Sequence, residues 1–498
     1  MADTPAARAV AEPIARHRWA ALVFISLAQL IVVFDASIMN IALPQAQADL
    51  GFNNADRQWV ITAYSLAFGA LLLLGGRIAD RWGRSRAFSI GLIGFGMASV
   101  LGGLAANIEL LLAARVLQGA FAALLAPAAL SLLSATFTIG SERAKAFGVF
   151  SAVAGAGGGI GMLLGGALTE YASWRWTLLV NTVFAAIALA GAVRYIQETG
   201  DKRKHERLDL PGIMLASAGL ASLVLGFSRA ETSGWGHGST IASLVAATVL
   251  LAAFLMVEHR AASPLLPLHV LADRNRGAAF LSGALASAVL FTQFLFLSYY
   301  MQSLLGFSPL LCGLAFLPVV ACLIIGSSYV GPPLFRCIPT RALMGTGYLL
   351  SAAGLLMLTG LTTDNAYVAL VLPAGVLIGI GSGTAFFCSM VLATDGVPMK
   401  DIGVASAVVN TSQQVGGAVG TALMSSIAAV AASSSGQATR PAAVHGYATA
   451  FLWASGLLLL AAIIAFTVTR RQGPSNLPND APTEPQEERL TTNITASK

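Results

Sequence analysis

Residues 22–43 read LVFISLAQLIVVFDASIMNIAL, an apolar run that contains one acidic residue, Asp35. A helix needs about 20 residues to cross the roughly 30 Å of hydrocarbon in a bilayer, so this run is long enough to span it. A carboxylate at the centre of such a helix costs roughly 2.5 to 3.5 kcal/mol on insertion scales. No other acidic residue lies near the middle of a predicted span. Asp35 therefore indicates a function, and proton exchange is the one its chemistry favours.

The composition predicts many such spans. The 498 residues are 56% hydrophobic and 10% charged, whereas soluble domains carry about 25% charged residues. The sequence therefore predicts an all-α membrane protein. Apolar runs of roughly 18 to 25 residues occur fourteen times, beginning near Trp19, Trp59, Ala87, Leu110, Ala146, Thr177, Leu210, Thr240, Gly277, Leu311, Ala342, Tyr367, Gly403 and Tyr447.

The basic residues predict the orientation, because Lys and Arg are retained on the cytoplasmic side of a membrane. With fourteen spans, both termini lie on one side. Of the 29 Lys and Arg residues, 24 fall on that side and four on the other. This ratio predicts that both termini are cytoplasmic. The net charge of +6 follows from the topology, so nucleic-acid binding is not indicated.

Cofactor and enzyme chemistry are not indicated by any motif. The four cysteines lie in or beside spans without CxxC pairing, and the six histidines fall in loops or at span ends, so neither a metal site nor a disulfide is predicted. We find no GxxxxGK[ST] loop, HExxH pair or GxSxG elbow in a suitable context. The sequence therefore favours a transporter that uses neither ATP nor a cofactor.

Glycine is abundant, with 51 residues, and it concentrates in the fifth and thirteenth spans. Small residues let membrane helices approach closely. Gly157, Gly161 and Gly165 are four residues apart and share one helix face, with Gly166 beside them. Ordinary helix packing accounts for such a face. The pattern also fits a surface on which helices slide or bend as the protein changes state, and we assign these four glycines to gating.

Residues 76–84 read GRIADRWGR, between the second and third spans, and this segment resembles the signature loop of the major facilitator superfamily. The resemblance runs from about residue 19 to residue 469. Further matches favour the fourteen-helix drug:proton antiporter subfamily: Asp35 with Asn40 and residues 42–44 (ALP), Gln58 and Trp59 with Tyr64, Arg115 with Gln118 and Gly119, residues 174–176 (WRW), Leu208 and Asp209 with Gly212, and Asn410 with Gln413 and Gln414.

Two departures from the family pattern concern the fifth span and the second half. The antiporter motif of the family reads Gly-Pro-x-x-Gly-Gly, whereas residues 161–166 read GMLLGG. The missing proline removes a helix-breaking residue and weakens the inference that transport is outward. The corresponding loop of the second half, residues 331–341, contains no acid, so the internal repeat is degenerate there.

The resemblance implies two six-helix bundles and two extra spans, with the substrate cavity between the bundles near the bilayer midplane. The expected parts are a cytoplasmic lead (1–18), the first bundle (19–196), a cytoplasmic loop (197–209), the extra pair (210–258), a second cytoplasmic loop (259–276), the second bundle (277–469) and a disordered cytoplasmic tail (470–498).

The resemblance also implies the function. We expect a monomeric, multi-pass protein of a bacterial plasma membrane that exports amphipathic drugs, cationic or neutral, in exchange for protons. Its partners are then the small-molecule substrate, protons and membrane lipids. Two alternatives use the same fold: a lipid or glycolipid exporter, and a proton-coupled nutrient symporter.

Depth arithmetic relates Asp35 to Arg115, the one basic residue within a span. Asp35 lies nine residues before Pro44 at the outer end of its helix, roughly 13 Å, and Arg115 lies six residues after Glu109, roughly 9 Å. Because each charge is costly alone in the bilayer, we expect the two to contact each other, directly or through water. We assign the pair to proton coupling; a purely structural ion pair is the alternative.

The signature loop is expected to hold the cytoplasmic side closed through Gly76, Asp80, Arg81, Gly83 and Arg84. Asp80 is expected to face the N-terminus of the thirteenth span near Gly403, where the helix dipole favours an anion by roughly 0.3 to 1 kcal/mol. The arginines are either topology signals or partners of nearby acids, such as Asp395 and Asp401.

Amides and aromatic rings on the spans that line the family's cavity are candidates for substrate contact. Their mixture suits bulky amphipathic molecules, and aromatic faces also hold cations. Each of them is equally compatible with packing or hydrogen bonding between helices. The candidates are Gln118, Gln293, Phe294, Tyr299, Asn410 and Gln414.

Overall fold

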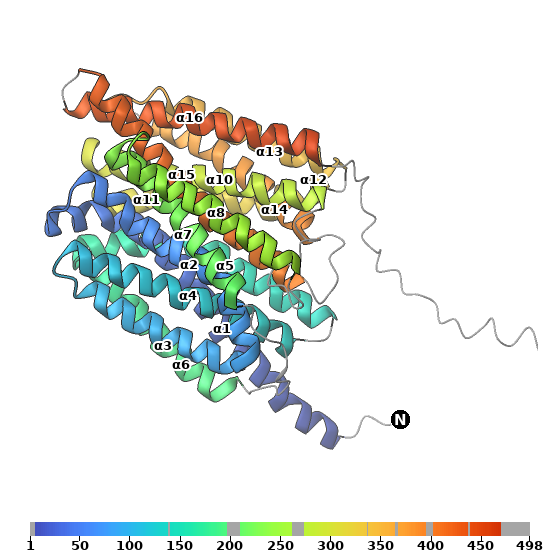
Figure 1. Cartoon of the computed structure of the whole chain (residues 1–498). Coiled ribbons are helices and arrows are strands. Elements are labelled where there is room, and N and C mark those ends of the chain that lie inside the picture. The colour runs from blue at the N-terminus through green and yellow to red at the C-terminus, as the bar shows by residue number, and fades with distance from the viewer. Residues whose placement is uncertain are drawn as a thin grey trace, which may run out of the picture.

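The computed structural model describes residues 5–137, 140–196, 210–260, 273–335, 337–363, 367–394, 402–436 and 439–469. Within these ranges the chain is helical and contains no strand (Figure 1). The first part of the chain forms α1 (Pro5–Leu50), α2 (Asn54–Trp82), α3 (Arg84–Gly103), α4 (Ile108–Thr136), α5 (Gly140–Tyr171), α6 (Trp176–Tyr195), α7 (Leu210–Ser233) and α8 (Gly238–Arg260).

The remainder of the chain forms α10 with η1 (Arg274–Tyr299, Tyr300–Leu304), α11 with η2 and α12 (Pro309–Ile325, Gly326–Val330, Gly331–Phe335), α13 (Thr340–Leu358), η3 with α14 (Tyr367–Val371, Leu372–Thr394), α15 (Ile402–Ser434) and α16 (Thr439–Val468). Every predicted span start falls inside one of these helical segments. Among the described residues, 11 helices are long and apolar enough to cross a membrane.

Short polar side chains start several of the helices. Asn53 accepts a hydrogen bond from the backbone N–H of Asp56 at 2.9 Å and so caps α2. Asn107 accepts one from Leu110 at 2.9 Å and caps α4 in the same way. These side chains satisfy N–H groups that have no partner within the helix. We call the end of the molecule that carries these two turns the far end, and the end that carries the α2–α3 turn the near end.

The α2–α3 turn consists of a single residue, Gly83. Its φ of 102° lies in a region that side chains with a Cβ rarely adopt. Glycine at this position of the signature loop therefore has a backbone reason, which is to reverse the chain direction between two long helices.

The helices form two bundles (Figure 1). In the first bundle, α1 packs on α4, α5 and α6, while α4 packs on α2 and α3. In the second, α10 packs on α14, α15 and α16, while α13 packs on α14 and α16. The bundles meet along two seams, where α2 contacts α15 and where α5 contacts α11. This is the predicted architecture of two six-helix units.

Glycines bring the helices close at the seam between α5 and α11. A Cβ added at Gly166 would lie 2.5 Å from the carbonyl oxygen of Pro309, and one at Gly313 would lie 2.5 Å from that of Met162. Gly157, Gly161 and Gly165 lie on another face of α5, against Leu30, Phe34 and Ile38 of α1 respectively. One helix thus uses two glycine faces, one within its bundle and one across the seam.

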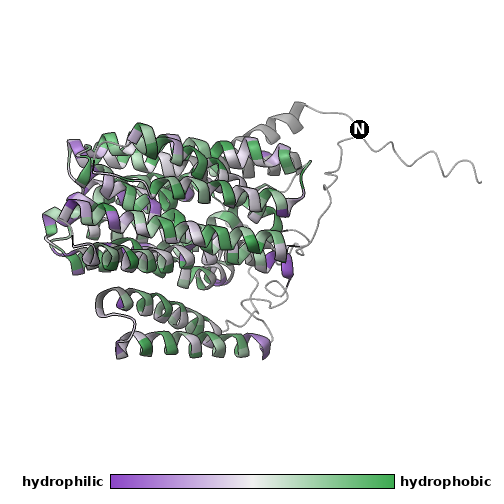
Figure 2. Ribbon diagram, turned by 90° about the horizontal axis from the view of Figure 1, so that it is seen from above, coloured by the Kyte–Doolittle hydropathy of each residue, from purple (hydrophilic) through white to green (hydrophobic). Residues whose placement is uncertain are grey.

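The additional pair α7–α8 lies beside the two bundles (Figure 2). Helix α7 packs on both α2 and α15, and α8 packs on α7. The Ser217 hydroxyl of α7 donates to the carbonyl oxygen of Ala70 in α2 at 2.9 Å. The sequence predicts a peripheral pair; α8 has that position, whereas α7 also covers the seam between α2 and α15.

Some predicted segments lie outside the described residues. They are the loop 197–209, most of the loop 259–276 and the tail 470–498. The acids Asp395 and Asp401 also lie outside them, as does the side chain of Asp80. The partners expected for the signature loop therefore stay a prediction.

Replacement of Gly75 tests the close packing of α2 on α4. A methyl group there would lie 2.0 Å from the carbonyl oxygen of Ala123, so Gly75→Ala is expected to lower the free energy of unfolding by about 1 to 3 kcal/mol. Gly456→Ala is the matched control, because nothing lies within 4 Å of an added Cβ at that helical position. Unfolding in mixed micelles measures both; equal stabilities would contradict the packing argument.

Candidate functional site

Asp35 is enclosed by its own bundle. It lies in α1, and its side chain is 0% exposed. Three other helices of the bundle direct polar side chains towards it: Ser99 from α3, Arg115 and Gln118 from α4, and Asn181 from α6. A buried carboxylate is tolerated in such a place only when it is paired and hydrogen-bonded.

Arg115 supplies the opposite charge. Its Nη1 donates to Asp35 Oδ2 at 2.6 Å, so the contact predicted from depth is present. Its Nε donates to the carbonyl oxygen of Val60 at 3.0 Å, and the guanidinium lies 4.5 Å from the ring centroid of Tyr64. Val60 and Tyr64 both belong to α2, so Arg115 ties the carboxylate of α1 to a helix at the seam.

Two amides complete the surroundings of the carboxylate. Gln118 Nε2 donates to Asp35 Oδ1 at 3.0 Å and to Ser99 Oγ at 2.9 Å, while its Oε1 accepts from Arg115 Nη1 at 3.0 Å. Asn181 Nδ2 donates to the same Oδ1 at 2.7 Å. Both carboxylate oxygens thus accept hydrogen bonds, and one of those bonds comes from the guanidinium.

Sequence reasoning missed Asn181 and Ser99. Asn181 is the one amide in the apolar helix α6, and the rule that singles out Asp35, a polar group inside an apolar span, also applies to it. Gln118 was predicted as a cavity residue; it is buried within the first bundle and belongs to the Asp35 network.

The two bundles are joined at the far end by polar contacts between α1 and α10. Ser298 Oγ donates to the carbonyl oxygen of Asn40 at 2.7 Å. Gln302 Nε2 donates to that of Ile41 at 3.1 Å. The Tyr299 hydroxyl, another predicted cavity residue, donates to Gln47 Oε1 at 2.8 Å.

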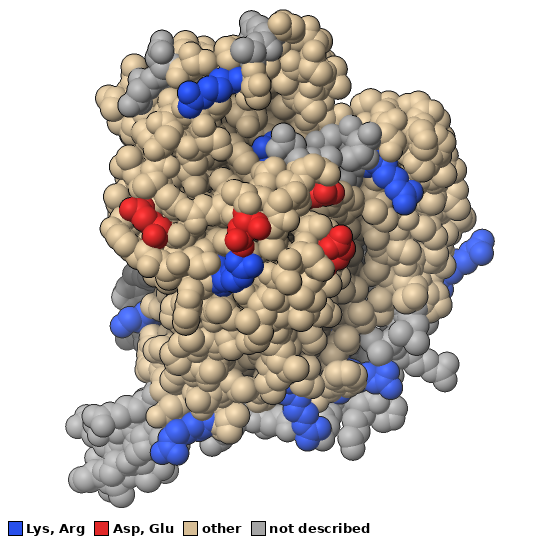
Figure 3. Space-filling model, turned by 90° about the vertical axis from the view of Figure 1, so that its left-hand side faces the viewer, with Lys and Arg blue, Asp and Glu red and all other residues tan. Residues whose placement is uncertain are grey.

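Two more contacts strengthen the far-end closure. The Arg57 guanidinium of α2 lies 4.1 Å from the ring centroid of Tyr299. Glu170, at the end of α5, accepts from the backbone N–H of Leu310 at 2.9 Å and so caps α11 of the other bundle. Figure 3 looks onto this end, where acidic and basic side chains stand among a mainly uncharged surface. In this conformation the far end is therefore closed between α1, α2 and α5 on one side and α10 and α11 on the other.

The other predicted cavity residues lie in different surroundings. Gln293 of α10 is fully buried, and neither polar atom of its amide has a hydrogen-bond partner among the described residues. Phe294 packs edge-on against Phe316 of α11, with ring centroids 5.3 Å apart. Asn410 of α15 is exposed. Gln414, also in α15, lies close to α2, since a Cβ added at Gly69 would be 3.0 Å from the Cβ of Gln414.

The residues of the signature loop that the sequence assigns to gating lie at the near end. Gly76 is close to Pro127 of α4, since an added Cβ would be 3.7 Å from that ring. Arg81 and Arg84 are exposed on either side of Gly83.

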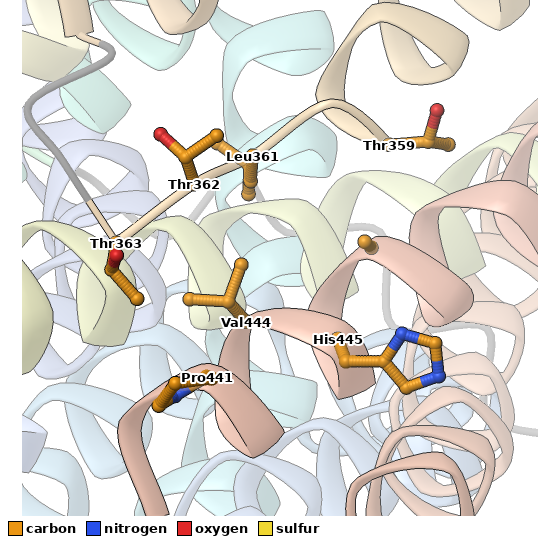
Figure 4. Close-up of a pocket in the computed structure, with 8 residues that line it drawn as sticks. Thr359, Leu361, Thr362, Thr363, Pro441, Val444 and His445 are labelled. Carbon is orange, nitrogen blue, oxygen red and sulfur yellow. The ribbon is translucent and has the colours of Figure 1, made fainter. Parts of the chain in front are cut away.

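A pocket of about 290 Å³ lies at the far end of the second bundle (Figure 4). Residues after α13 and the first turns of α16 form its walls, with His445 at one side. None of the predicted site residues lines it, so we give it no role in transport. The lining residues are Thr359, Leu361, Thr362, Thr363, Pro441, Val444, His445 and Ala448.

A family model described as the Major Facilitator Superfamily matches residues 25–421. The chain belongs to this superfamily. It is a multi-pass membrane transporter and not an enzyme. The resemblance read from residues 76–84 is thereby confirmed.

Two relatives match across nearly the whole chain. The puromycin resistance protein of Streptomyces alboniger is 48% identical over 461 residues, which cover 91% of each chain. The cephamycin export protein of Amycolatopsis lactamdurans is 39% identical over 449 residues, covering 89% of this chain and 91% of the relative. The relatives are thus named for antibiotic resistance and export.

Solved structures support the fold. A bacterial homologue of the human lysosomal transporter Spinster, in an inward-facing and unoccupied conformation, matches with a TM-score of 0.66 and 17% identity, over 92% of this chain and 99% of that one. The peptide transporter POT in complex with sulfate matches with a TM-score of 0.67 and 14% identity, over 89% and 93%. At these identities the likeness concerns the fold alone.

Loss of Arg115 should destabilise the protein strongly. Arg115→Leu leaves the Asp35 carboxylate without its counter-charge in a site where it is 0% exposed, and an uncompensated buried charge costs about 3 to 5 kcal/mol. Asp49→Asn is the control, because Asp49 pairs with Arg175 at the exposed far end and exposed pairs contribute up to about 1 kcal/mol. Unfolding in mixed micelles compares the two; similar losses would show that the buried pair is not needed for stability.

Proposed function

We propose that this protein exports amphipathic antibiotics, cationic or neutral, in exchange for protons, with Asp35 as the proton-carrying group. The observation that carries the proposal is the pairing of Asp35 with Arg115 inside the first bundle. An ion pair with a purely structural role needs only that its two charges compensate each other. This pair, however, is connected through Val60 and Tyr64 to α2, which lies at a seam between the bundles.

Coupling follows from the charge balance of the network. When Asp35 takes up a proton, Arg115 loses its anionic partner and keeps the weaker contacts to Val60, Gln118 and Tyr64. The guanidinium is then the uncompensated charge, and a shift of α4 relative to α2 relieves it. Because α2 packs on α15 and α7, this shift changes the seam between the bundles. The substrate therefore need not touch the carboxylate for proton and substrate movements to be coupled.

The orientation makes the far end extracellular. Four basic residues lie in the segments at the far end of the molecule, and 24 lie on the side of the two termini. Basic residues favour the cytoplasm. The contacts of Tyr299, Ser298 and Gln302 with α1 then close the outward path. A proton that enters through the full membrane potential contributes about 2.3 kcal/mol per 100 mV. The free energy released by proton entry is available to break these contacts.

The substrate class rests on the relatives and on the polar residues of the seams. The similar proteins are named for puromycin, cephamycin and lincomycin, which favours an antibiotic. Asn410 and Gln414 on α15, and Gln293 with Phe294 on α10, are the residues we assign to substrate contact. The gating glycines of α5 serve as the surface along which α1 and α11 move.

One experiment separates export from import and from lipid transport. Purified protein is reconstituted in vesicles of known orientation, and proton flux is recorded on addition of cationic, neutral and anionic amphiphiles. Export predicts proton movement opposite to that of an antibiotic-like cation or neutral compound. Movement in the same direction as a nutrient would establish a symporter, and flux that responds only to added lipid would establish a lipid exporter. Either result overturns the proposal.

Neutralisation of Asp35 is the direct test of the proton site. Asp35→Asn keeps the shape of the side chain, but an amide does not exchange a proton near neutral pH. Proton-driven efflux is therefore expected to fall at least about 100-fold, to the level of empty vesicles. Asp49→Asn, an acid near the end of the same helix, is expected to keep efflux close to that of the unchanged protein. If Asp35→Asn retained proton-driven efflux, Asp35 would not be the coupling group.

Asp80 is the residue to test for gating at the near end. Asp80→Asn removes a charge from the signature loop, which we assign to closure of the cytoplasmic side, and is expected to reduce the rate of transport several-fold. The amount of protein in the membrane should stay unchanged, because the loop keeps its four basic residues. Transport rate and membrane content are measured on the same preparation; an unchanged rate would contradict the gating role.

A further inference from the structure

The Asp35 network contains one buried oxygen without a hydrogen-bond partner. Asn181 of α6 is 0% exposed, and its Nδ2 donates to Asp35 Oδ1 at 2.7 Å. Its Oδ1 has no partner among the described residues. A buried polar atom without a partner is costly, so an orphan oxygen next to a titrating carboxylate needs an explanation.

We propose that Asn181 is a positioning residue that donates to Asp35 when the carboxylate is charged and accepts from it when the acid is protonated. This inference rests on the proposed function, because it concerns how the proposed proton carrier changes state. It adds a residue of α6, a helix that takes part in neither seam.

The other oxygens around Asp35 already accept hydrogen bonds. Gln118 Oε1 accepts from Arg115, and Ser99 Oγ accepts from Gln118 while it donates to the carbonyl oxygen of Phe95. The carbonyl oxygen of Val60 accepts from Arg115. Within this network, a proton added to the carboxylate finds a free acceptor in Asn181 Oδ1.

The exchange needs one rotation and no other chemistry. A proton binds Asp35 Oδ1 and forms an O–H bond; no bond is broken in the protein. The amide of Asn181 turns by half a revolution about its Cβ–Cγ bond, a soft torsion for an asparagine side chain, and its oxygen takes the place of Nδ2. One pole of the amide is unpaired in either orientation, so the two orientations have a similar cost. When the proton leaves, the amide turns back and donates again.

The remaining groups near Asp35 do not compete for this role. Among the described side chains, the charged and titratable groups that face it from neighbouring helices are Arg115 of α4 and Tyr64 of α2. Arg115 has no acceptor, and the Tyr64 hydroxyl donates to the carbonyl oxygen of Val32 at 3.1 Å. Helix α5 meets α1 through Gly157, Gly161 and Gly165, while Ser298 of α10 and Gln302 of η1 contact α1 towards its far end. Asn181 is therefore the group that can match both states of the carboxyl.

The test is infrared difference spectroscopy of the full-length protein in proteoliposomes, recorded between low and high pH. In the unchanged protein we expect a carbonyl band of a protonated carboxylic acid, absent in Asp35→Asn, at the low frequency typical of an acid whose O–H is hydrogen-bonded. In Asn181→Leu, which has a similar volume but no polar atom, the band is expected to move to higher frequency.

Transport should change in parallel. The pH of half-maximal transport in Asn181→Leu is expected to move by about one pH unit to the alkaline side, because the lost donor to a carboxylate is charge-assisted and the lost acceptor is neutral. The substrate concentration for half-maximal rate should stay the same, since α6 lies outside the seams. Thr182→Val is the matched control: Thr182 is the next residue of α6, and its hydroxyl donates to Gly96 at 3.1 Å without contact to Asp35.

The outcomes separate this inference from the proposed function. Absence of any band that depends on Asp35 would overturn the proton site itself. A band that depends on Asp35 but keeps its frequency in Asn181→Leu would overturn the exchange and leave the proton site standing. If Asn181→Leu does not fold, the spectrum of the unchanged protein is the test. A band at the frequency of a free acid would show that the Asp35 O–H has no acceptor, which would overturn the exchange. A shift in Thr182→Val equal to that in Asn181→Leu would also overturn the role of Asn181.

Discussion

The ion pair between Asp35 and Arg115 is the constraint on which the first bundle depends. The two opposite charges are buried, and each oxygen of the carboxylate has a donor. Three helices, α1, α4 and α6, must hold their positions for these bonds to exist together. The requirement explains why so apolar a bundle keeps amides and a hydroxyl at its centre: every one of them satisfies a partner that the bilayer cannot. A change of charge on the carboxylate therefore changes hydrogen bonds on all three helices.

Close packing characterises both contacts of α5, with α1 inside its bundle and with α11 across the seam. Glycines let α5 approach α1 and α11 so closely that an added methyl group would collide with backbone or side-chain atoms at several positions. Helix surfaces formed by glycine have few side chains that interdigitate, so they oppose sliding less than surfaces packed with large side chains do. The far-end contacts of α1 with α10 and η1 are of another kind, since they are hydrogen bonds between particular polar groups. The contacts between the bundles are therefore of two kinds, glycine-lined at the α5–α11 seam and polar at the far end.

Much of the fold followed from the sequence, because span length and the retention of basic residues are set by the bilayer rather than by tertiary contacts. The fourteen runs and the approach of Asp35 to Arg115 needed only helix rise and the cost of charge. Asn181 and Ser99 were not found, because one amide or hydroxyl in an apolar helix carries no sign of where it points. Gln118 was assigned to the cavity for the same reason, although its side chain faces the interior of its bundle. The π-helical segments η2, between α11 and α12, and η3, directly before α14, were not predicted either. At η2 the neighbouring helix comes close, since a Cβ added at Gly326 would lie 2.4 Å from the carbonyl oxygen of Ile380, and such a tertiary contact is not visible in the sequence.

Helix α7 makes the two flanks of the transporter unlike each other. It lies over the meeting line of α2 and α15, whereas the line between α5 and α11 has no such cover among the described helices. A hydrophobic compound in the surrounding lipid therefore meets α7 over the α2–α15 seam on one flank, and the α5–α11 seam directly on the other. The pair α7–α8 thus makes the transporter asymmetric with respect to the lipid on its two flanks.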